Sequence, residues 1–466
     1  MGATRKMAKF CSSLSYEDLS RDVVDRVRYL ALDFLGVAVR GTLTKSAEIV
    51  RNFAKDMGCE GGVIIGTSIR APYQYAALAN GTSSHSLELD DVSNESSAHV
   101  GVAIFPAAFA MAELTGCDEK KFIEAVVSGY EVMIRLGKAL NPASHYARGF
   151  HPTGTCGTFG AATAASKILN LDEGQTLSAL GIAGSQAAGV MEYLTSGTWT
   201  KPLHAGWAAH NGMIAALLAK RGFKGPHTIV EGRFGFLHAY SDDFDLEKLL
   251  AGLGDSFEIM RVSVKPHACC RYEQGPIDGI LKLIKENKLK AQEVEKVTLG
   301  ILKAGFPIIV EPKELKYNPR TVVDAQFSMP FGAAVAILYG GVSLDEYTAD
   351  NLESSEVKEI MGRVSCVVDT ELEEVYPKHW PASVEIATKD GRKFSTRIDY
   401  PKGDPENPLS WEELILKFNN LSSHVFSENR RNQVISRVRS LGVGESIYGL
   451  TSLLSTGDTL KPAPPD

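Results

Sequence analysis

Ionisable side chains are concentrated in residues 81–106, GTSSHSLELDDVSNESSAHVGVAIFP. His85, Glu88, Asp90 and His99 all lie in this stretch, and apolar sequence with helical spacing lies on both sides of it. Ionisable groups are costly beside a core unless they are paired or used in chemistry. We therefore predict that this stretch forms one wall of an acid–base active site.

His99 is the strongest candidate within the stretch. The apolar sequence VGVAIFPAAF begins directly behind it, which places it at the boundary of a core. Histidine titrates near neutrality and can remove or deliver a proton there. Glu88, Asp90 or Asp91 could orient this histidine. The alternative is that the three carboxylates form a solvated helix end.

His151 lies in a second candidate block, RGFHPTGTCGTFG. Pro152 disfavours a helical backbone at His151, and the glycines allow a ligand to approach the backbone closely. A helix that begins near Thr155 or Thr158 would offer free N–H groups to a carboxylate. The alternative is a turn histidine before a closely packed helix.

Two lysines lie where anions could bind. Lys201 precedes Pro202 at the start of an expected helix, where a positive side chain is unfavourable unless an anion is near. Lys265 ends a strand-like run and precedes the expected helix that contains Arg271. Either lysine could instead be solvated. We predict that both lysines and Arg271 hold the carboxylates of a small acid.

Composition excludes several other classes of protein. The net charge of −7 does not favour binding to nucleic acid or to an anionic membrane. There is no Walker pattern, no clean dinucleotide fingerprint, no HExxH and no GxSxG, and no second ligand cluster favours a metal. The seven cysteines show no CxxC spacing, and residues 100–114 are too few to span a bilayer. We expect a cytoplasmic protein.

The elements that must position these residues are mostly helical in the first half of the chain. Ser15 and Asp18 form a capping-box pattern before the first long helix. Small residues are frequent, so the helices can pack closely. The further helices are predicted at residues 45–55, 72–91, 97–114, 119–137, 158–169, 172–190 and 201–221.

The pattern changes near residue 250. Strands are predicted at 257–265 and 294–303, and at 383–388 and 393–398 with Asp390-Gly391 in the turn between them. Helices are predicted at 275–286, 321–339 and 351–364, and two more begin near Ser410 and Ser427 after the linker PKGDPENP. The sequence thus predicts a mainly α protein. A helical domain is formed by residues 1–260 and 401–460, an α+β domain by 261–400, and a disordered tail by 461–466.

Taken together, these blocks resemble the MmgE/PrpD family. The resemblance rests on NGTSSHSLELDD, RGFHPTGTCGTFGAATAASK, TKPLHAGWAAHNG, KPHACCRYEQGPIDGI and NPRTVVDAQFSMPFGAA. The family includes 2-methylcitrate dehydratases, cis-aconitate decarboxylases and iminodisuccinate epimerases. The resemblance implies a large all-helical domain split in sequence, a smaller α+β lid, a homodimer and no cofactor.

The resemblance also implies roles for single residues. The family histidines match His99 and His151, and the family lysines match Lys201 and Lys265. Three positions depart from the animal cis-aconitate decarboxylases: Glu88 replaces aspartate, Val92 replaces threonine and Cys270 replaces histidine. The loop before His99 is also one residue longer. These differences predict a substrate that departs from that of the best-known relatives.

The predicted function is a cofactor-independent lyase, either a dehydratase or a decarboxylase, for a small di- or tricarboxylic acid of the 2-methylcitrate or cis-aconitate type. The alternatives are an epimerase of an iminodisuccinate-like acid and a non-catalytic polycarboxylate-binding homologue. The predicted catalytic residues are His99, His151, Glu88 and Asp91, and the predicted substrate-binding residues are Lys201, Lys265, Arg271 and Cys270. No nucleic acid, membrane or metal is expected.

Overall fold

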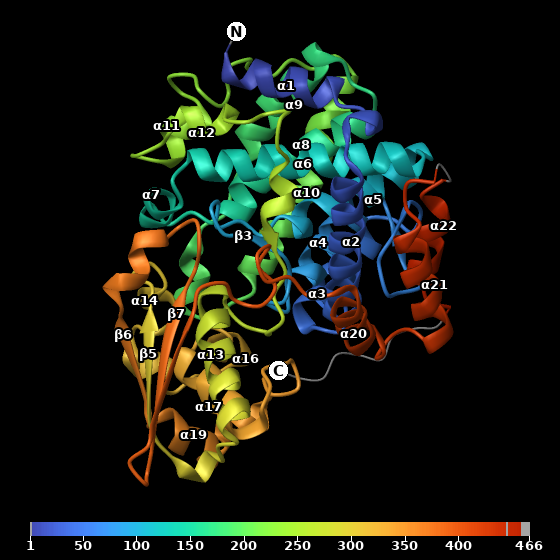
Figure 1. Ribbon diagram of the computed structural model, residues 1–466. Coiled ribbons are helices and arrows are strands. Elements are labelled where there is room, and N and C mark those ends of the chain that lie inside the picture. Colours follow the sequence, from blue (N-terminus) through green and yellow to red (C-terminus); the bar gives the residue numbers. More distant parts are fainter. Residues whose placement is uncertain (1, 444–445, 458–466) are drawn as a thin grey trace. The chain divides into compact units, whose positions relative to one another are not determined.

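The computed structural model describes residues 2–443 and 446–457, which form two compact units (Figure 1). Unit 1 consists of Met1–Ser86, Asp90–Val262 and a C-terminal segment from Ser410, and unit 2 consists of Leu87–Leu89 and Ser263–Leu409. Unit 1 is helical and unit 2 is a smaller α+β unit. The predicted fold class, mainly α with a large helical part and a smaller α+β part, is confirmed.

Unit 1 is built around helix α8 (Pro152–Ile168). Helices α5 (Gly101–Thr115), α6 (Glu119–Ala139), α9 (Glu173–Gln186) and α10 (Thr200–Lys220) pack against it. The other helices of this unit are α1 (Ala3–Ser13), α2 (Arg21–Gly41), α3 (Lys45–Asp56), α4 (Tyr73–Ser84), α7 (Pro142–Ala147), α11 (Phe236–Tyr240), α12 (Leu246–Leu250), α20 (Trp411–Ser422), α21 (Glu428–Arg439) and α22 (Tyr448–Thr451). The C-terminal helices α20 and α21 pack against α2, far from them in sequence.

Glycines allow these helices to approach closely. A Cβ atom on Gly160 of α8 would lie 2.6 Å from Ile104 Cδ1 of α5. A Cβ atom on Gly81 of α4 would lie 2.6 Å from the Cα of Gly206 of α10. The crossing of α4 over α10 therefore has no room for a side chain on either helix. This crossing fixes the end of α4 and the beginning of α10, where two of the candidate site segments lie.

Unit 2 contains a four-stranded sheet in the order β6-β5-β7-β8. The strands are β5 (Val294–Ile301), β6 (Val364–Val368), β7 (Ala382–Thr388) and β8 (Lys393–Ile398). β5 and β6 are parallel, whereas β7 pairs antiparallel with both β5 and β8. Helix α13 (Arg271–Asn287) packs against β7 and β8, and α17 (Met329–Tyr339) packs against α13. The predicted hairpin is present, with Gly391 at φ +85° in its turn.

The remaining elements are short. They are the strands β1 (Gly62–Val63), β2 (Arg70–Ala71), β3 (Val92–Ser93) and β4 (Val262–Ser263), the helices α14 (Phe306–Ile309), α15 (Lys313–Lys316), α16 (Val322–Ala325), α18 (Ala349–Glu353) and α19 (Ser355–Met361), and the 3-10 turns at Tyr16–Asp18, Met191–Thr195, Glu258–Arg261, Ala291–Glu293, Thr370–Val375 and Ser452–Leu454.

The helix predicted at 72–91 is too long. It ends at Ser84, where the hydroxyls of Ser83 and Ser84 donate to backbone carbonyls one turn earlier. Glu88 then has φ 53°, a left-handed value that no α-helix contains. His85 and Glu88 therefore lie beyond the end of α4.

The strand predicted at 257–265 is also wrong. Its first half is the 3-10 turn Glu258–Arg261, and only Val262–Ser263 is extended as a strand. Side chains take up its backbone groups: Arg26 donates to the carbonyls of Ile259 and Val262. Alternating apolar residues thus occur here without a neighbouring strand over most of the segment.

Two predicted helices in unit 2 are interrupted by serine caps. Ser328 accepts a hydrogen bond from the N–H of Phe331 and begins α17 inside the segment predicted as one helix at 321–339. Ser354 begins α19 in the same way, and the strand β6 follows where residues 351–364 were expected to end a helix. The unit boundaries fall after Val262 and after Leu409. The predicted disordered tail, 461–466, lies outside the described residues.

Candidate active site

Asp90 joins two histidines in unit 1. His85 follows the last residue of α4, and His99 lies just before Val100, which begins α5. Asp90 Oδ2 is 3.0 Å from His85 Nδ1 and 2.7 Å from His99 Nδ1, and all three side chains are buried. An ionised carboxylate only accepts hydrogen bonds, so each Nδ1 carries the proton. The Nε2 atom of each neutral ring then holds the lone pair.

A second pair of histidines lies beside the first. His151 begins α8 with an extended backbone, and its N–H donates to Gly189 O at 3.0 Å. His151 Nδ1 is 3.2 Å from His204 Nδ1 on α10. The His85 and His151 rings are stacked, with centroids 5.8 Å apart and planes 7° apart. Helix α8 begins at Pro152, earlier than predicted, because proline suits the first helical position.

Burial and positive neighbours keep the second pair neutral. Burial holds the pKa of His151 well below its usual range, and His204, His85 and Lys201 add to this effect. Burial, His85 and Lys201 lower the pKa of His204 to about 4. Lys201 is itself buried in the first turn of α10. At neutral pH both imidazoles of this pair are therefore uncharged. Either ring can accept a proton, but neither is in the protonated form that acts as an acid.

Asp91 has a different position from Asp90. Its carboxylate accepts from Tyr130 OH at 2.7 Å and from the N–H of Gly101 at 2.8 Å, at the start of α5. Burial raises the pKa of Asp91 to about 7, although these two hydrogen bonds oppose the rise. Asp90 is the carboxylate that contacts the histidines, and a catalytic role for Asp91 stays a prediction.

Four predicted site residues belong to unit 2. Lys265 is buried, with Nζ 3.5 Å from Glu88 Oε2 and 3.3 Å from Cys269 O. Arg271, the first residue of α13, forms a buried ion pair with Asp404, a residue that the sequence analysis did not select. Cys270 lies just before Arg271 and is buried. The structure thus pairs Lys265 with Glu88.

The adjacent Cys269 is buried, and its Sγ accepts a hydrogen bond from Gln274 Nε2 at 3.2 Å. Burial raises the pKa of its thiol well above the usual range, and the charge of Glu273 raises it further. A thiol in this state is a weak nucleophile, because the thiolate is the reactive form.

Two members of the histidine cluster, His85 and His204, were not among the predicted site residues. His204 follows Lys201 by three positions and therefore shares its helix face. His85 lies within the helix predicted at 72–91, but in the structure it follows the end of α4 at Ser84. The signal that could have selected His85 is its place at the polar end of a small-residue helix.

The same cluster contains the residues that could hold a metal ion. Among the described residues, His85, Asp90 and His99 each offer a possible ligand atom, and these atoms all lie within 4.8 Å of one another. Their observed separations from the shared carboxylate oxygen, 2.7 and 3.0 Å, are hydrogen-bond distances. The geometry therefore fits an imidazole–carboxylate–imidazole hydrogen-bonded group.

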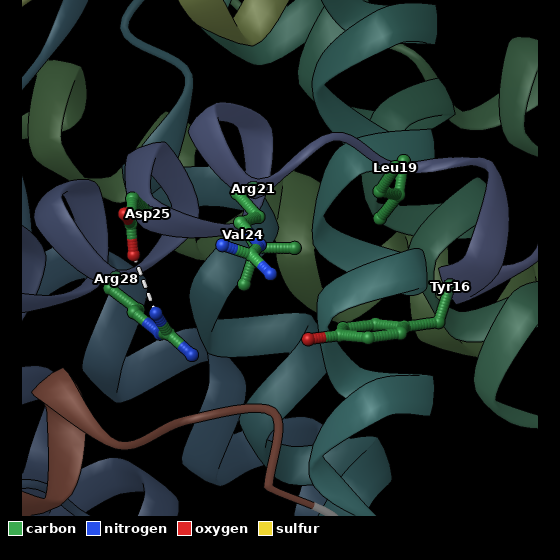
Figure 2. A pocket seen from close by; sticks show the side chains of 6 residues that line it. All are labelled: Tyr16, Leu19, Arg21, Val24, Asp25 and Arg28. Carbon is green, nitrogen blue, oxygen red and sulfur yellow. Dashed lines mark hydrogen bonds and ion pairs between the residues drawn. The ribbon is translucent and has the colours of Figure 1, made fainter.

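A separate pocket lies at the start of α2 (Figure 2). It is lined by Tyr16, Leu19, Arg21, Val24, Asp25 and Arg28. Asp25 and Arg28 form an ion pair at 2.5 Å, but the Asp25 side chain is 57% exposed, so the pair adds little stability. None of the predicted site residues lines this pocket, and we assign it no role.

No helix in the described part of the chain is both long enough and apolar enough to cross a membrane.

Comparison with known proteins gives matches along nearly the whole chain. A model of the MmgE/PrpD N-terminal domain matches residues 5–249, and a model of the MmgE/PrpD C-terminal domain matches residues 267–441. A cis-aconitate decarboxylase-like protein of Aspergillus oryzae is 28% identical, over 97% of each chain. The cis-aconitate decarboxylase of Aspergillus terreus is 27% identical over 97% of this chain and 96% of its own. The human cis-aconitate decarboxylase is 28% identical over 99% and 95%.

His204 should make the protein sensitive to acid. Its pKa is about 4 when folded and about 6.5 when unfolded. It therefore contributes stability above pH 6.5 that is lost as the pH falls towards 4. In His204→Gln, the melting temperature should fall less between pH 7 and pH 4.5 than in the wild type. His227→Gln, at an exposed histidine, is the control; equal falls in His204→Gln and the wild type would contradict the prediction.

Proposed function

The chain belongs to the MmgE/PrpD family, and from this premise we propose that it is a lyase for a small di- or tricarboxylic acid. The observation that carries the proposal is the His99–Asp90 contact, which lies in one unit with the neutral His151 and the buried Lys201. The names of the relatives support a decarboxylase of a cis-aconitate-like acid. Dehydration of a related acid uses the same residues.

His99 is the proposed acid–base residue. Asp90 accepts its Nδ1–H, which leaves Nε2 to take a proton from carbon or deliver one to it. The negative charge of Asp90 stabilises the imidazolium that forms. In a decarboxylation, the electron pair left by the departing CO₂ must be protonated, either at the carbon that lost CO₂ or at the carbon to which the double bond transfers the charge, and a protonated His99 can supply that proton. Glu88, which the sequence analysis named as catalytic, pairs with Lys265 and stays a proposed site residue.

Lys201 is the proposed carboxylate-binding residue of unit 1. Its ammonium group lies in the first turn of α10, where the free N–H groups of the helix also attract anions. A buried cation at this position is stabilised when a substrate carboxylate binds. Lys265, Arg271 and Cys270 remain proposed substrate-binding residues.

An epimerase is the second candidate. Epimerisation needs one acid–base group on each face of the reacting carbon. His99 contacts Asp90, whereas His151 contacts His204, so the cluster offers two imidazoles with separate partners. In this arrangement one histidine can remove a proton and the other can return it. The same arrangement supports a lyase equally well.

We also propose a homodimer, no required cofactor and a location in the cytoplasm. The dimer is supported by a series of partly exposed rings on three helices of unit 1. Phe53 of α3 contacts Tyr75 of α4, which contacts His210 of α10, and the His210 ring stacks on Trp207 at 4.9 Å. Trp207 is 41% exposed, an unusual position for a tryptophan unless a partner covers it.

The proposed function predicts turnover of a small carboxylic acid. The protein should convert at least one of cis-aconitate, citrate, 2-methylcitrate and iminodisuccinate, and proton NMR in D₂O measures this conversion. His99→Asn should lower kcat by about 10²–10⁴-fold, because it removes the acid–base group. Deuterium uptake without loss of CO₂ or water would replace the lyase with the epimerase. Binding without turnover of any acid would replace both with a non-catalytic binder.

Lys201→Gln should weaken substrate binding more than it slows the chemistry. We expect KM to rise by at least about tenfold, since the loss of a charged hydrogen bond costs about 1.5–3 kcal/mol. Lys220→Gln, at the exposed end of the same helix, is the matched control and should leave KM unchanged. An unchanged KM in Lys201→Gln would remove this residue from the proposed site.

The dimer is tested by light scattering of the eluting protein. Trp207→Glu should produce a monomer, because it places a charge in the covered surface. Phe234→Glu alters a side chain that is 88% exposed and lies outside the ring series, and this variant should stay dimeric. A monomeric wild type would contradict the proposal.

A further inference from the structure

His85 has no role in the function proposed above, yet it shares the key carboxylate. Its Nδ1 is 3.0 Å from Asp90 Oδ2, the oxygen atom that His99 Nδ1 also contacts at 2.7 Å. The His85 and His99 ring centroids are 4.7 Å apart, and on its other side His85 stacks on His151. His85 is therefore the ring that connects the two proposed acid–base histidines.

A purely structural role explains this position poorly. His85 is 1% exposed, and its Nε2 atom is buried without a hydrogen-bond partner among the described residues. Leaving such an atom unsatisfied is costly, and an apolar side chain of similar size would avoid that cost. The Nδ1 contact with Asp90 is what the histidine provides and an apolar side chain cannot.

We infer that His85 is a positioning residue of the acid–base site, which holds Asp90 and thereby sets the orientation and proton affinity of His99. Two N–H groups that donate to one oxygen from two directions fix that carboxylate more firmly than one donor can. The second donor also draws part of the carboxylate charge away from His99. This inference depends on the proposed function for its catalytic consequence, but not for its geometric part.

The donor atom of His85 determines which substitutions are informative. Because Nδ1 makes the contact, the amide nitrogen of asparagine can replace it, whereas leucine removes the donor and keeps most of the volume. His85→Leu and His85→Asn are thus a matched pair. His238→Leu is the control, since His238 is exposed and its ring packs edge-on against Phe244.

With the substrate found above, His85→Leu should lower kcat by about 10- to 100-fold while KM changes less than about threefold, because misplacement of a catalytic group acts on the chemical step. His85→Asn should restore most of kcat, and His238→Leu should match the wild type. An equal loss in both His85 variants, or an effect on KM alone, would overturn the inference.

A spectroscopic measurement tests the geometry without any substrate. In protein labelled with ¹⁵N-histidine, His99 should carry its proton on Nδ1, with a resonance that the His99→Asn variant identifies. His85→Leu should shift this resonance and His85→Asn should return it towards the wild-type position. An unmoved resonance would overturn the inference, as would a stoichiometric divalent ion bound through the same Nδ1 atoms in the purified protein. Failure of turnover alone would contradict only the proposed function.

Discussion

One carboxylate oxygen that accepts hydrogen bonds from two imidazoles is the interaction on which the candidate site depends. Asp90 Oδ2 fixes the tautomers of His85 and His99 together, and through the ring of His85 it is linked to His151. The cluster is buried, so its electrostatic interactions are stronger than they would be in water. Asp90 is the carboxylate that contacts both His85 and His99 within it.

The helices of unit 1 explain how such a cluster can be held. His85 follows α4, His99 precedes α5, His151 begins α8 and Lys201 lies in the first turn of α10. Each side chain is thus attached at or beside a helix end, where the backbone leaves regular structure. Helix ends supply free backbone polar groups, and the packed helices supply rigidity.

Much of this arrangement was predictable from local patterns. Small-residue helices, the Asp390-Gly391 hairpin and the blocks around His99, His151 and Lys201 all have strong sequence signals. The end of α4 was not predictable, because serine hydroxyls and the left-handed backbone at Glu88 terminate it without glycine or proline. The choice of Asp90 over Asp91 was equally hidden. Both are buried, and they differ in hydrogen-bond partners that the sequence does not reveal: His85 and His99 for Asp90, and Tyr130 and the N–H of Gly101 for Asp91.

The crossing of Gly81 and Gly206 bears on how substrate preference can diverge among relatives. These glycines lie four residues before His85 and five after Lys201, about 6–8 Å along their helices. Because the two backbones are in direct contact, no side chain lies between them whose size a mutation could change. The contact therefore preserves the spacing of His85 and Lys201. Insertions in the irregular segment before His99, or substitutions at Val92, can then accumulate without moving the crossing of α4 and α10. Substrate preference can thereby change in evolution while the crossing of the two helices is retained.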